Sequence, residues 1–257
     1  MKKEKIDMHR LEDISAEECL KILQEVESYI IGMDLKVQGH EEAYKKKGFI
    51  LPYLYAYDNF LWGRWSYWHK ILAKKTTKGS GNIPQIKFSS IDDKRVQITL
   101  DMLRTCLNHP EATISNFADW LLWGFGQGDE LNIPKELNKH YYENFDIFFL
   151  QDNPFDYFSI ILEECSSEGS KKLTGYYSTP FDLAQLIYKL MNNKQEKNKT
   201  IYDGCVGCGA LLLPASNYHL KAYGQDISLI ALKLCLIQFI IYAPWFAHHP
   251  EDIELVD

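Results

Sequence analysis

Apolar residues at helical spacing dominate the first two thirds of the chain. The apolar positions between residues 20 and 30 follow a capping box formed by Ser15 and Glu18. The same spacing predicts further helices over residues 53–74, 92–107, 116–125, 135–148 and 155–166. The glycine-rich stretch 123–128 follows a helix-like run with no strand before it, so it indicates a helix end.

The pattern changes after residue 170. Two short apolar runs, 199–203 and 221–226, each end in an acidic residue and predict strands. Helical runs cover 209–220 and 228–243, and residues 252–257 could begin a third strand. Because strand, glycine turn, helix and strand alternate, a doubly wound α/β sheet is predicted to open here.

Composition places the 257-residue chain among ordinary soluble globular proteins, with 46% hydrophobic and 25% charged residues. No secretory signal opens it, and the longest apolar tract, 232–246, is too short and too interrupted to span a membrane. The six cysteines are scattered rather than arranged as a disulfide scaffold. We therefore expect a protein of the reducing cytoplasm, with no membrane partner.

Charge is unevenly distributed around a net value of −7. Residues 51–100 carry eight Lys and Arg against three Asp and Glu, whereas residues 101–257 carry 11 against 21. Cations displace counterions from phosphates, so the 51–100 segment is the expected contact with any DNA partner.

Eight aromatic rings lie between residues 53 and 70, beside Arg64 and Lys70. Such rings can stack on unpaired bases, or they can anchor a helical core. The core interpretation is favoured, because clustered rings on short helices are more often buried than bound to nucleic acid.

The stretch DGCVGCG, 203–209, has two interpretations. Cys205 and Cys208 could ligate zinc, but no second CxxC pair exists, and the adjacent His248 and His249 rarely ligate one ion together. No metal is therefore expected. Alternatively, the glycines form a turn that brings the backbone close to a cofactor.

The glycine interpretation has support on both sides of the loop. Gly207 and Gly209 fall between a predicted strand and helix, and Asp226 ends the next strand, where an acid can bind ribose hydroxyls. A dinucleotide loop would need a third glycine at position 212, which is leucine. The loop better suits a positively charged nucleoside without pyrophosphate, such as S-adenosylmethionine. A turn that binds nothing is the alternative.

Three motifs in order resemble those of the N6-adenine DNA methyltransferases, in the style of the modification subunits of type I restriction systems. They are GYYSTP (175–180), DGCVGCGA (203–210) and GQDI (224–227), and they correspond to the family's GxYxTP, DPACGTGG and GQ(D/E)(I/V). The segment 153–165 is similar to the helix that precedes the first motif.

The resemblance implies an S-adenosylmethionine site. It places Asp203 near the methionine amine, Gly207 and Gly209 beside the cofactor, and Asp226 on its ribose. It also implies that three residues line the methionine end of the cofactor: Tyr177, Thr179 and Pro180. Cys205, Val206 and Cys208 depart from the small and hydroxyl residues of the family loop.

The family's methylating motif, (D/N/S)PP(Y/F/W), has no good counterpart. The nearest segments are 152–155 (DNPF), 51–53 (LPY) and 243–245 (APW), and none combines a polar residue with a double proline. The family motif directs the adenine amine at the methyl group and stacks on the flipped base. The catalytic residues are therefore unknown.

The predicted fold class is α/β, an N-terminal helical domain followed by a partial Rossmann-like methyltransferase sheet. We expect a helical domain of unknown role at 1–110, and a helical lead-in with a truncated α/β domain at 111–257, with its core at 170–257. Only 31 residues follow Asp226, so the first strand would keep an unpaired edge. The N-terminal helices, a partner chain, a homodimer or a longer parent chain could cover it.

Two classes of function follow from this. The resemblance implies an S-adenosylmethionine-binding protein of the adenine-specific DNA methyltransferases of restriction-modification systems, which methylates adenine N6 of DNA if it is catalytically complete. The alternative is a non-catalytic partner or vestigial module that lacks the acceptor-base motif.

Overall fold

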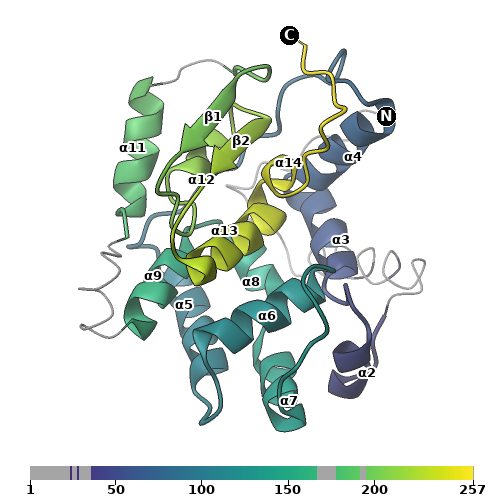
Figure 1. Cartoon of the computed structure of the whole chain (residues 1–257), viewed down its shortest axis with the longest axis vertical. Helices are drawn as coiled ribbons and strands as arrows, with labels where there is room; N and C mark the ends of the chain where they lie inside the picture. Colours follow the sequence, from purple (N-terminus) through teal and green to yellow (C-terminus); the bar gives the residue numbers. More distant parts are fainter. Residues whose placement is uncertain (1–23, 25–27, 29–35, 167–177, 192–194, 257) are drawn as a thin grey trace.

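The computed structural model describes residues 24, 28, 36–166, 178–191 and 195–256. Helices make up most of it, and a small parallel sheet lies at one end (Figure 1). The helix expected after Ser15 lies almost wholly outside the described residues, as does Tyr177.

The first helices in chain order are α2 His40–Lys45, α3 Leu51–Leu61, α4 Arg64–Lys74, α5 Lys94–Leu107 and α6 Ile114–Gly124. The next are α7 Lys135–Asn144, α8 Ile147–Asp152, α9 Tyr157–Cys165 and α11 Phe181–Met191. The α/β part contains β1 Thr200–Asp203, α12 Leu212–Ala215, β2 Lys221–Gly224, α13 Leu229–Tyr242 and α14 Pro244–Ala247. The helices predicted at 92–107, 116–125, 155–166 and 228–243 are thus confirmed, as is the helix end at 123–128.

The single helix predicted over 53–74 is wrong, because the chain turns at Gly63 between α3 and α4. Gly63 has φ 68°, in the left-handed region that favours glycine. The Asp58 carboxylate then accepts a hydrogen bond from the Trp65 amide at 2.8 Å, which satisfies the start of α4. Local capping therefore overrides continuous helical spacing here.

The helix predicted over 135–148 is also divided, into α7 and α8. The Asp146 side chain accepts a hydrogen bond from the Phe148 amide at 2.8 Å and caps α8. The helical spacing continues through this cap, so the spacing alone does not mark the end of α7.

The strands β1 and β2 form a parallel pair in which Thr200 lies opposite Lys221 and Asp203 opposite Gly224. Both predicted strands are therefore confirmed. The connecting helix α12 is much shorter than the predicted run 209–220. The helix ends at Ala215, and the guanidinium of the buried Arg64 donates a hydrogen bond to the Ser216 carbonyl at 2.7 Å.

Residues 252–256 do not extend this sheet. Glu254 forms an isolated parallel bridge with Thr76, and the Thr77 amide donates to the Glu254 carbonyl at 3.0 Å. The segment 76–84 is a loop, and the buried Thr77 bonds it to the C-terminal segment. The expectation of a third strand here is wrong, because 75–77 offers this segment backbone partners away from β1 and β2.

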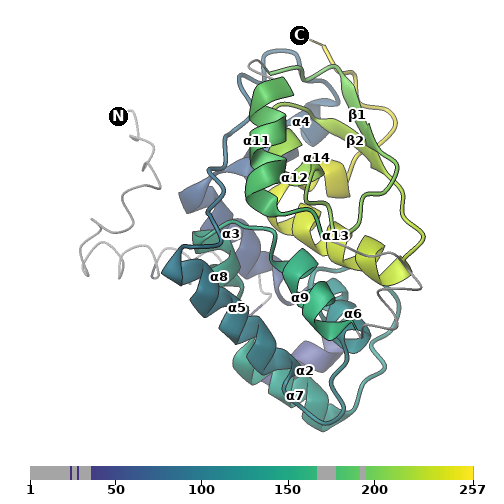
Figure 2. The ribbon, with the colours of Figure 1, turned by 90° about the vertical axis from the view of Figure 1, so that its left-hand side faces the viewer.

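One large hydrophobic cluster contains buried residues from Val37 to Ala243, on both sides of position 110. Figure 2 shows α2 and α7 at one end of the molecule and the sheet at the other, with α13 crossing between them. The helix α13 packs against α6, α8 and α9, so the helical part forms the support of the α/β part. The division into two domains at residue 110 stays a prediction.

Candidate cofactor loop

The predicted cofactor loop leaves β1 at Asp203, at the edge where both parallel strands end. The Gln225 amide donates to the Asp203 carbonyl at 3.0 Å, and the Val206 amide donates to the Gln225 carbonyl at 2.9 Å. The loop is therefore bonded to the end of β2, and Asp203 and Asp226 lie on either side of it.

Both acidic side chains hold loop amides. Asp203 accepts from the Cys205 amide at 3.0 Å, and Asp226 accepts from the Gly207 amide at 2.9 Å and the Ser228 amide at 2.8 Å. Both are half-buried. A carboxylate offers about four lone-pair positions, so each retains acceptor capacity beyond these bonds.

The two loop glycines have different surroundings. Gly207 has φ 53° and is half-buried, and its amide points to Asp226. Gly209 has φ 98°, and a Cβ there would lie 3.0 Å from Cys235 Sγ and 3.1 Å from Phe239 Cε1. Close packing against α13 therefore already requires glycine at 209, whatever the loop binds.

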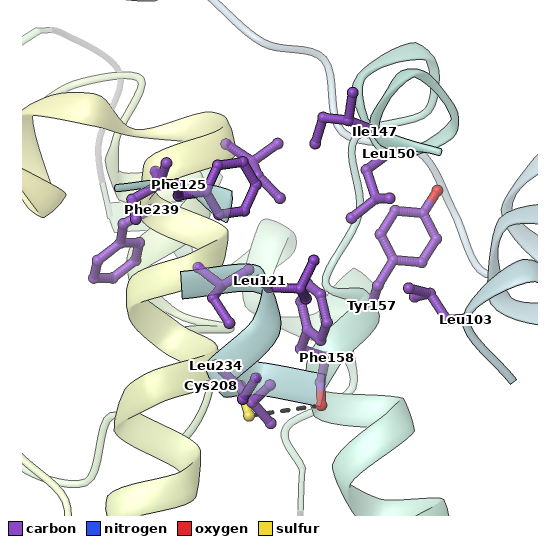
Figure 3. Close-up of a cluster of buried hydrophobic side chains, with 14 of the residues drawn as sticks. Leu103, Leu121, Phe125, Ile147, Leu150, Tyr157, Phe158, Cys208, Leu234 and Phe239 are labelled. Atoms are coloured by element: carbon purple, nitrogen blue, oxygen red, sulfur yellow. Dashed lines mark hydrogen bonds between the residues drawn. The ribbon is translucent and has the colours of Figure 1, made fainter. Parts of the chain in front are cut away.

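The buried side of the loop packs into the main hydrophobic core. Cys208 is buried, and its thiol donates to the Phe158 carbonyl at 3.6 Å, as Figure 3 shows among core side chains from α5, α6, α8, α9 and α13. Burial raises the pKa of the neighbouring Cys235 thiol well above its usual range. Cys205 is instead exposed, so the two cysteines of the loop do not face one ion. No cluster of metal-ligating side chains occurs among the described residues.

The helix α9 contacts both predicted cofactor motifs. Ser178, in the upstream motif, donates a hydrogen bond to Glu163, while the loop is bonded to Phe158. Five residues separate these two contacts, which is about 8 Å along a helix axis. The described part of the upstream motif and the loop therefore meet on one helix.

Two of the predicted methionine-end residues lie at the start of α11. The Pro180 carbonyl accepts from the Ala184 amide at 3.1 Å, Thr179 is half-buried and Pro180 is exposed. Their contact with a cofactor stays a prediction, and Tyr177 lies outside the described residues.

Three polar residues around the loop were not predicted from the sequence: Gln238, Asp156 and Glu163. The Gln238 amide donates to Asp156 at 2.8 Å and to the Cys208 carbonyl at 2.6 Å. A glutamine in the otherwise apolar run 234–242 was the available signal, since a buried amide requires partners.

The three partial matches to the methylating motif lie in or against the core. Phe155 is 2% exposed and packs edge-on against Phe181, and the Pro154 carbonyl accepts from the Ser89 amide at 2.8 Å. Trp245 is fully buried, and Pro52 and Pro244 lie in the first turns of α3 and α14. The rings of Phe155 and Trp245 are thus buried, whereas Tyr53 of the 51–53 segment is half-buried.

The aromatic segment 53–70 packs against the core, with three of its eight rings buried and the other five half-buried. Trp65, Tyr67 and Trp68 are buried, and Arg64 is fully buried with its guanidinium 4.3 Å from the centre of the Trp245 ring. These groups are unavailable to nucleic acid, as the core interpretation predicted. Lys70, Lys74 and Lys78 of the same segment are exposed.

A cavity of about 290 Å³ lies away from the loop, in the helical part. Its lining is Val37, Phe49, Ile50, Tyr53, Trp120, Tyr142, Phe145, Asp146, Ile147 and Phe148. No predicted cofactor residue lines it. Among the described helices, none is long and apolar enough to cross a membrane.

Comparison with known proteins gives one match. The model of the N-6 DNA methylase family matches residues 152–244, from the end of α8 to the start of α14. This segment includes α9, the predicted cofactor loop and β2, and the match supports the family assigned by resemblance. No curated protein and no solved structure matches the chain.

Proposed function

We propose that the chain binds S-adenosylmethionine at the loop 203–209 and contributes to methylating the adenine N6 of DNA. The N-6 DNA methylase match over residues 152–244 supports the reaction class. The observation that carries the site is the loop itself, held between the ends of two parallel strands by Asp203 and Asp226. We interpret β1, α12 and β2 as the opening of a methyltransferase sheet.

The residues present fit this cofactor. Asp226 has remaining acceptor capacity for ribose hydroxyls, and Ile227 beside it is 89% exposed, an apolar surface for a purine ring. Asp203 would accept from the methionine ammonium, and the acids favour a ligand with a sulfonium charge. Thr179, Pro180 and Tyr177 would enclose the methionine end, and Gly207 would allow close approach.

The cofactor supplies an electrophilic methyl group on sulfur. In the proposed transfer, the adenine N6 lone pair would form the new N–C bond as the C–S bond breaks, and the amine would lose a proton to solvent, giving N6-methyladenine and S-adenosylhomocysteine. The chain's residues would hold the donor in line with the amine. The exposed Lys70, Lys74 and Lys78 are the proposed DNA contacts within 51–100.

A second polypeptide or a second copy would complete the acceptor site. Parallel sheets are normally covered on both faces, but Tyr202 and Tyr223, paired across β1 and β2, are 61% and 56% exposed. The helix α11 also exposes Leu183, Leu186 and Leu190, and Figure 1 shows it on the β1 side of the sheet. A partner bound to these exposed tyrosines and leucines would complete the protein, as expected if the chain is the cofactor-binding half of a modification enzyme of a restriction system.

Labelled methyl transfer tests this proposal. We expect the purified chain to bind S-adenosylmethionine but to leave adenine-containing DNA unlabelled until a polypeptide with an N-P-P-Y motif is added. The next reading frame in the genome is the first source to examine. Labelling of DNA by the chain alone would contradict the need for a partner. Absence of cofactor binding at millimolar concentration would favour the alternative, a non-catalytic or vestigial module.

A further inference from the structure

Gln238 is a buried amide in the middle of the apolar helix α13. It is fully buried, and its Nε2 donates to two different segments, to Asp156 Oδ1 at 2.8 Å and to the Cys208 carbonyl at 2.6 Å. Its Oε1 accepts from the Phe158 amide at 3.5 Å. One side chain therefore connects α13, the start of α9 and the cofactor loop.

The bond to Cys208 fixes one peptide group of the loop. The Cys208 carbonyl and the Gly209 amide belong to the same planar peptide unit. Gln238 holds the carbonyl, and the Gly209 amide donates to the Val206 carbonyl at 2.8 Å. With both ends bonded, this peptide cannot rotate without breaking a buried hydrogen bond.

The backbone partners and Asp156 together set the direction of the Gln238 amide. The Cys208 carbonyl only accepts and the Phe158 amide only donates, so the NH₂ group of Gln238 must face Cys208 and Asp156, and its oxygen must face Phe158. Asp156 is 1% exposed and caps α9, where it also accepts from the Ser159 amide at 3.4 Å. The orientation is thus set in part from α9, the same helix that contacts the upstream motif through Glu163.

We infer that Gln238, oriented by Asp156, is a positioning residue that holds the 208–209 peptide and keeps the loop in its cofactor-binding shape. This role rests on the proposed function, because it concerns the same loop. Gln238 reaches the loop from the core side, and it acts on the ligand through the backbone between Gly207 and Gly209.

Hydrogen exchange of the loop amides tests this without any ligand. Gln238→Met keeps the side-chain length and removes both donors, so we expect amides 205–209 to exchange at least about tenfold faster at equal global stability. Gln151→Met is the matched control, because Gln151 is also buried and donates to the Leu54 carbonyl at 3.1 Å. Equal loop protection in the two variants would overturn the inference.

Cofactor affinity gives the second readout. Gln238→Met should weaken S-adenosylmethionine binding about tenfold, while Gln151→Met, with a similar loss of stability, should not. Unchanged affinity in Gln238→Met would also overturn the inference. If the wild-type protein binds no cofactor, the proposed function fails, but the exchange result still decides the role of Gln238.

Gln238→Glu provides a second variant should the methionine protein fold poorly. It keeps the shape but replaces the NH₂ group, which donates to both Asp156 and the Cys208 carbonyl, by an oxygen that can donate to at most one of them, so the loop should open. Loop exchange at the wild-type rate in this variant would contradict the inference as directly.

Discussion

Glycine 209 combines an unusual backbone angle with a tight contact. Its φ of 98° disfavours other residues, and the space for a Cβ is taken by Cys235 and Phe239 of α13. The motif predicts Gly209 to lie beside the cofactor, whereas the packing against α13 already explains the glycine. Packing against the core can thus require a glycine at a motif position, whatever the loop binds.

Gly209→Ala should destabilise the protein by about 2 kcal/mol, because it adds steric overlap to backbone strain. The measurement is the free energy of unfolding in urea. Gly81→Ala is the control, since Gly81 has φ 75° with nothing within 4 Å of its Cβ position. It should cost only about 1 kcal/mol of strain. Equal losses in the two variants would contradict the packing argument.

Asp226 supports the loop and is also the proposed ribose ligand. Asp226→Asn leaves one oxygen to accept and turns the other into a donor, so S-adenosylmethionine affinity should fall about tenfold or more. Calorimetric titration measures this. The exposed Asp129 gives a control with the same charge change, and Asp129→Asn should bind normally. Unchanged affinity in Asp226→Asn would remove Asp226 from the site.

At the level of elements, the turn between α3 and α4 holds the helical part to the α/β part. Arg64, at the start of α4, bonds to Ser216 after α12 and to the Tyr242 carbonyl at the end of α13. Asp58 is 1% exposed, and burial raises its pKa to about 7. A buried carboxyl and a buried guanidinium thus lie where the turn between α3 and α4 contacts the ends of α12 and α13.

Asp58 should make stability fall as pH rises. Its folded pKa is raised, so its contribution is fully present below the unfolded value near 4 and is lost as pH rises toward about 7. Arg64 stays protonated between pH 5 and 8, because its lowered pKa is still about 9. Between pH 5 and 7 the free energy of unfolding of the wild type should therefore fall by on the order of 2 kcal/mol through Asp58, and Asp58→Asn should not show this fall.

The measurement is the difference in unfolding free energy between wild type and Asp58→Asn at several pH values. Burial lowers the pKa of His69, His219, His248 and His249, which favours the opposite trend in both proteins. Subtracting the two profiles removes that common part. A difference that stays constant with pH would contradict the raised pKa of Asp58.

Elements with strong local signals could be predicted from the sequence. The strand ending at Asp203, the strand near Tyr223 and the helix α13 were predicted because short apolar runs and long apolar helices have distinct lengths. The turn at Gly63 and the cap at Asp146 were missed, because side-chain capping competes with a continuing helical pattern. Boundaries set by a single hydrogen bond leave little trace in hydrophobic spacing.

At the scale of the whole molecule, contacts between residues far apart in the chain could not be predicted from the sequence. Nothing in the pattern links Gln238 with Cys208, or Arg64 with Tyr242, across 30 and 178 residues. The motif spacing located the predicted cofactor loop, and the residues that pack beneath this loop come from α9 and α13. Of the predicted site residues, Asp203, Gly207, Gly209 and Asp226 gather at one loop, while the role of each stays a prediction.

The exposed leucines of α11 should be dispensable for folding of the chain alone. Leu186 is 52% exposed, so Leu186→Lys should change the free energy of unfolding by less than about 0.5 kcal/mol and reduce binding of an apolar dye. Ala184→Lys, at a fully buried position on the same helix, is the contrasting variant and should destabilise strongly. A large stability loss in Leu186→Lys would mean that this face is already covered in the protein.

The central claim is that the loop 203–209 holds S-adenosylmethionine, and nuclear magnetic resonance of ¹⁵N-glycine-labelled protein tests it most directly. The chain has 15 glycines, and Gly204, Gly207 and Gly209 lie in the loop. On titration with S-adenosylmethionine, these three amide signals should shift and saturate together, while those of Gly79 and Gly81 stay fixed. Binding without shifts in the loop, or no shift in any glycine at millimolar cofactor, would contradict the account.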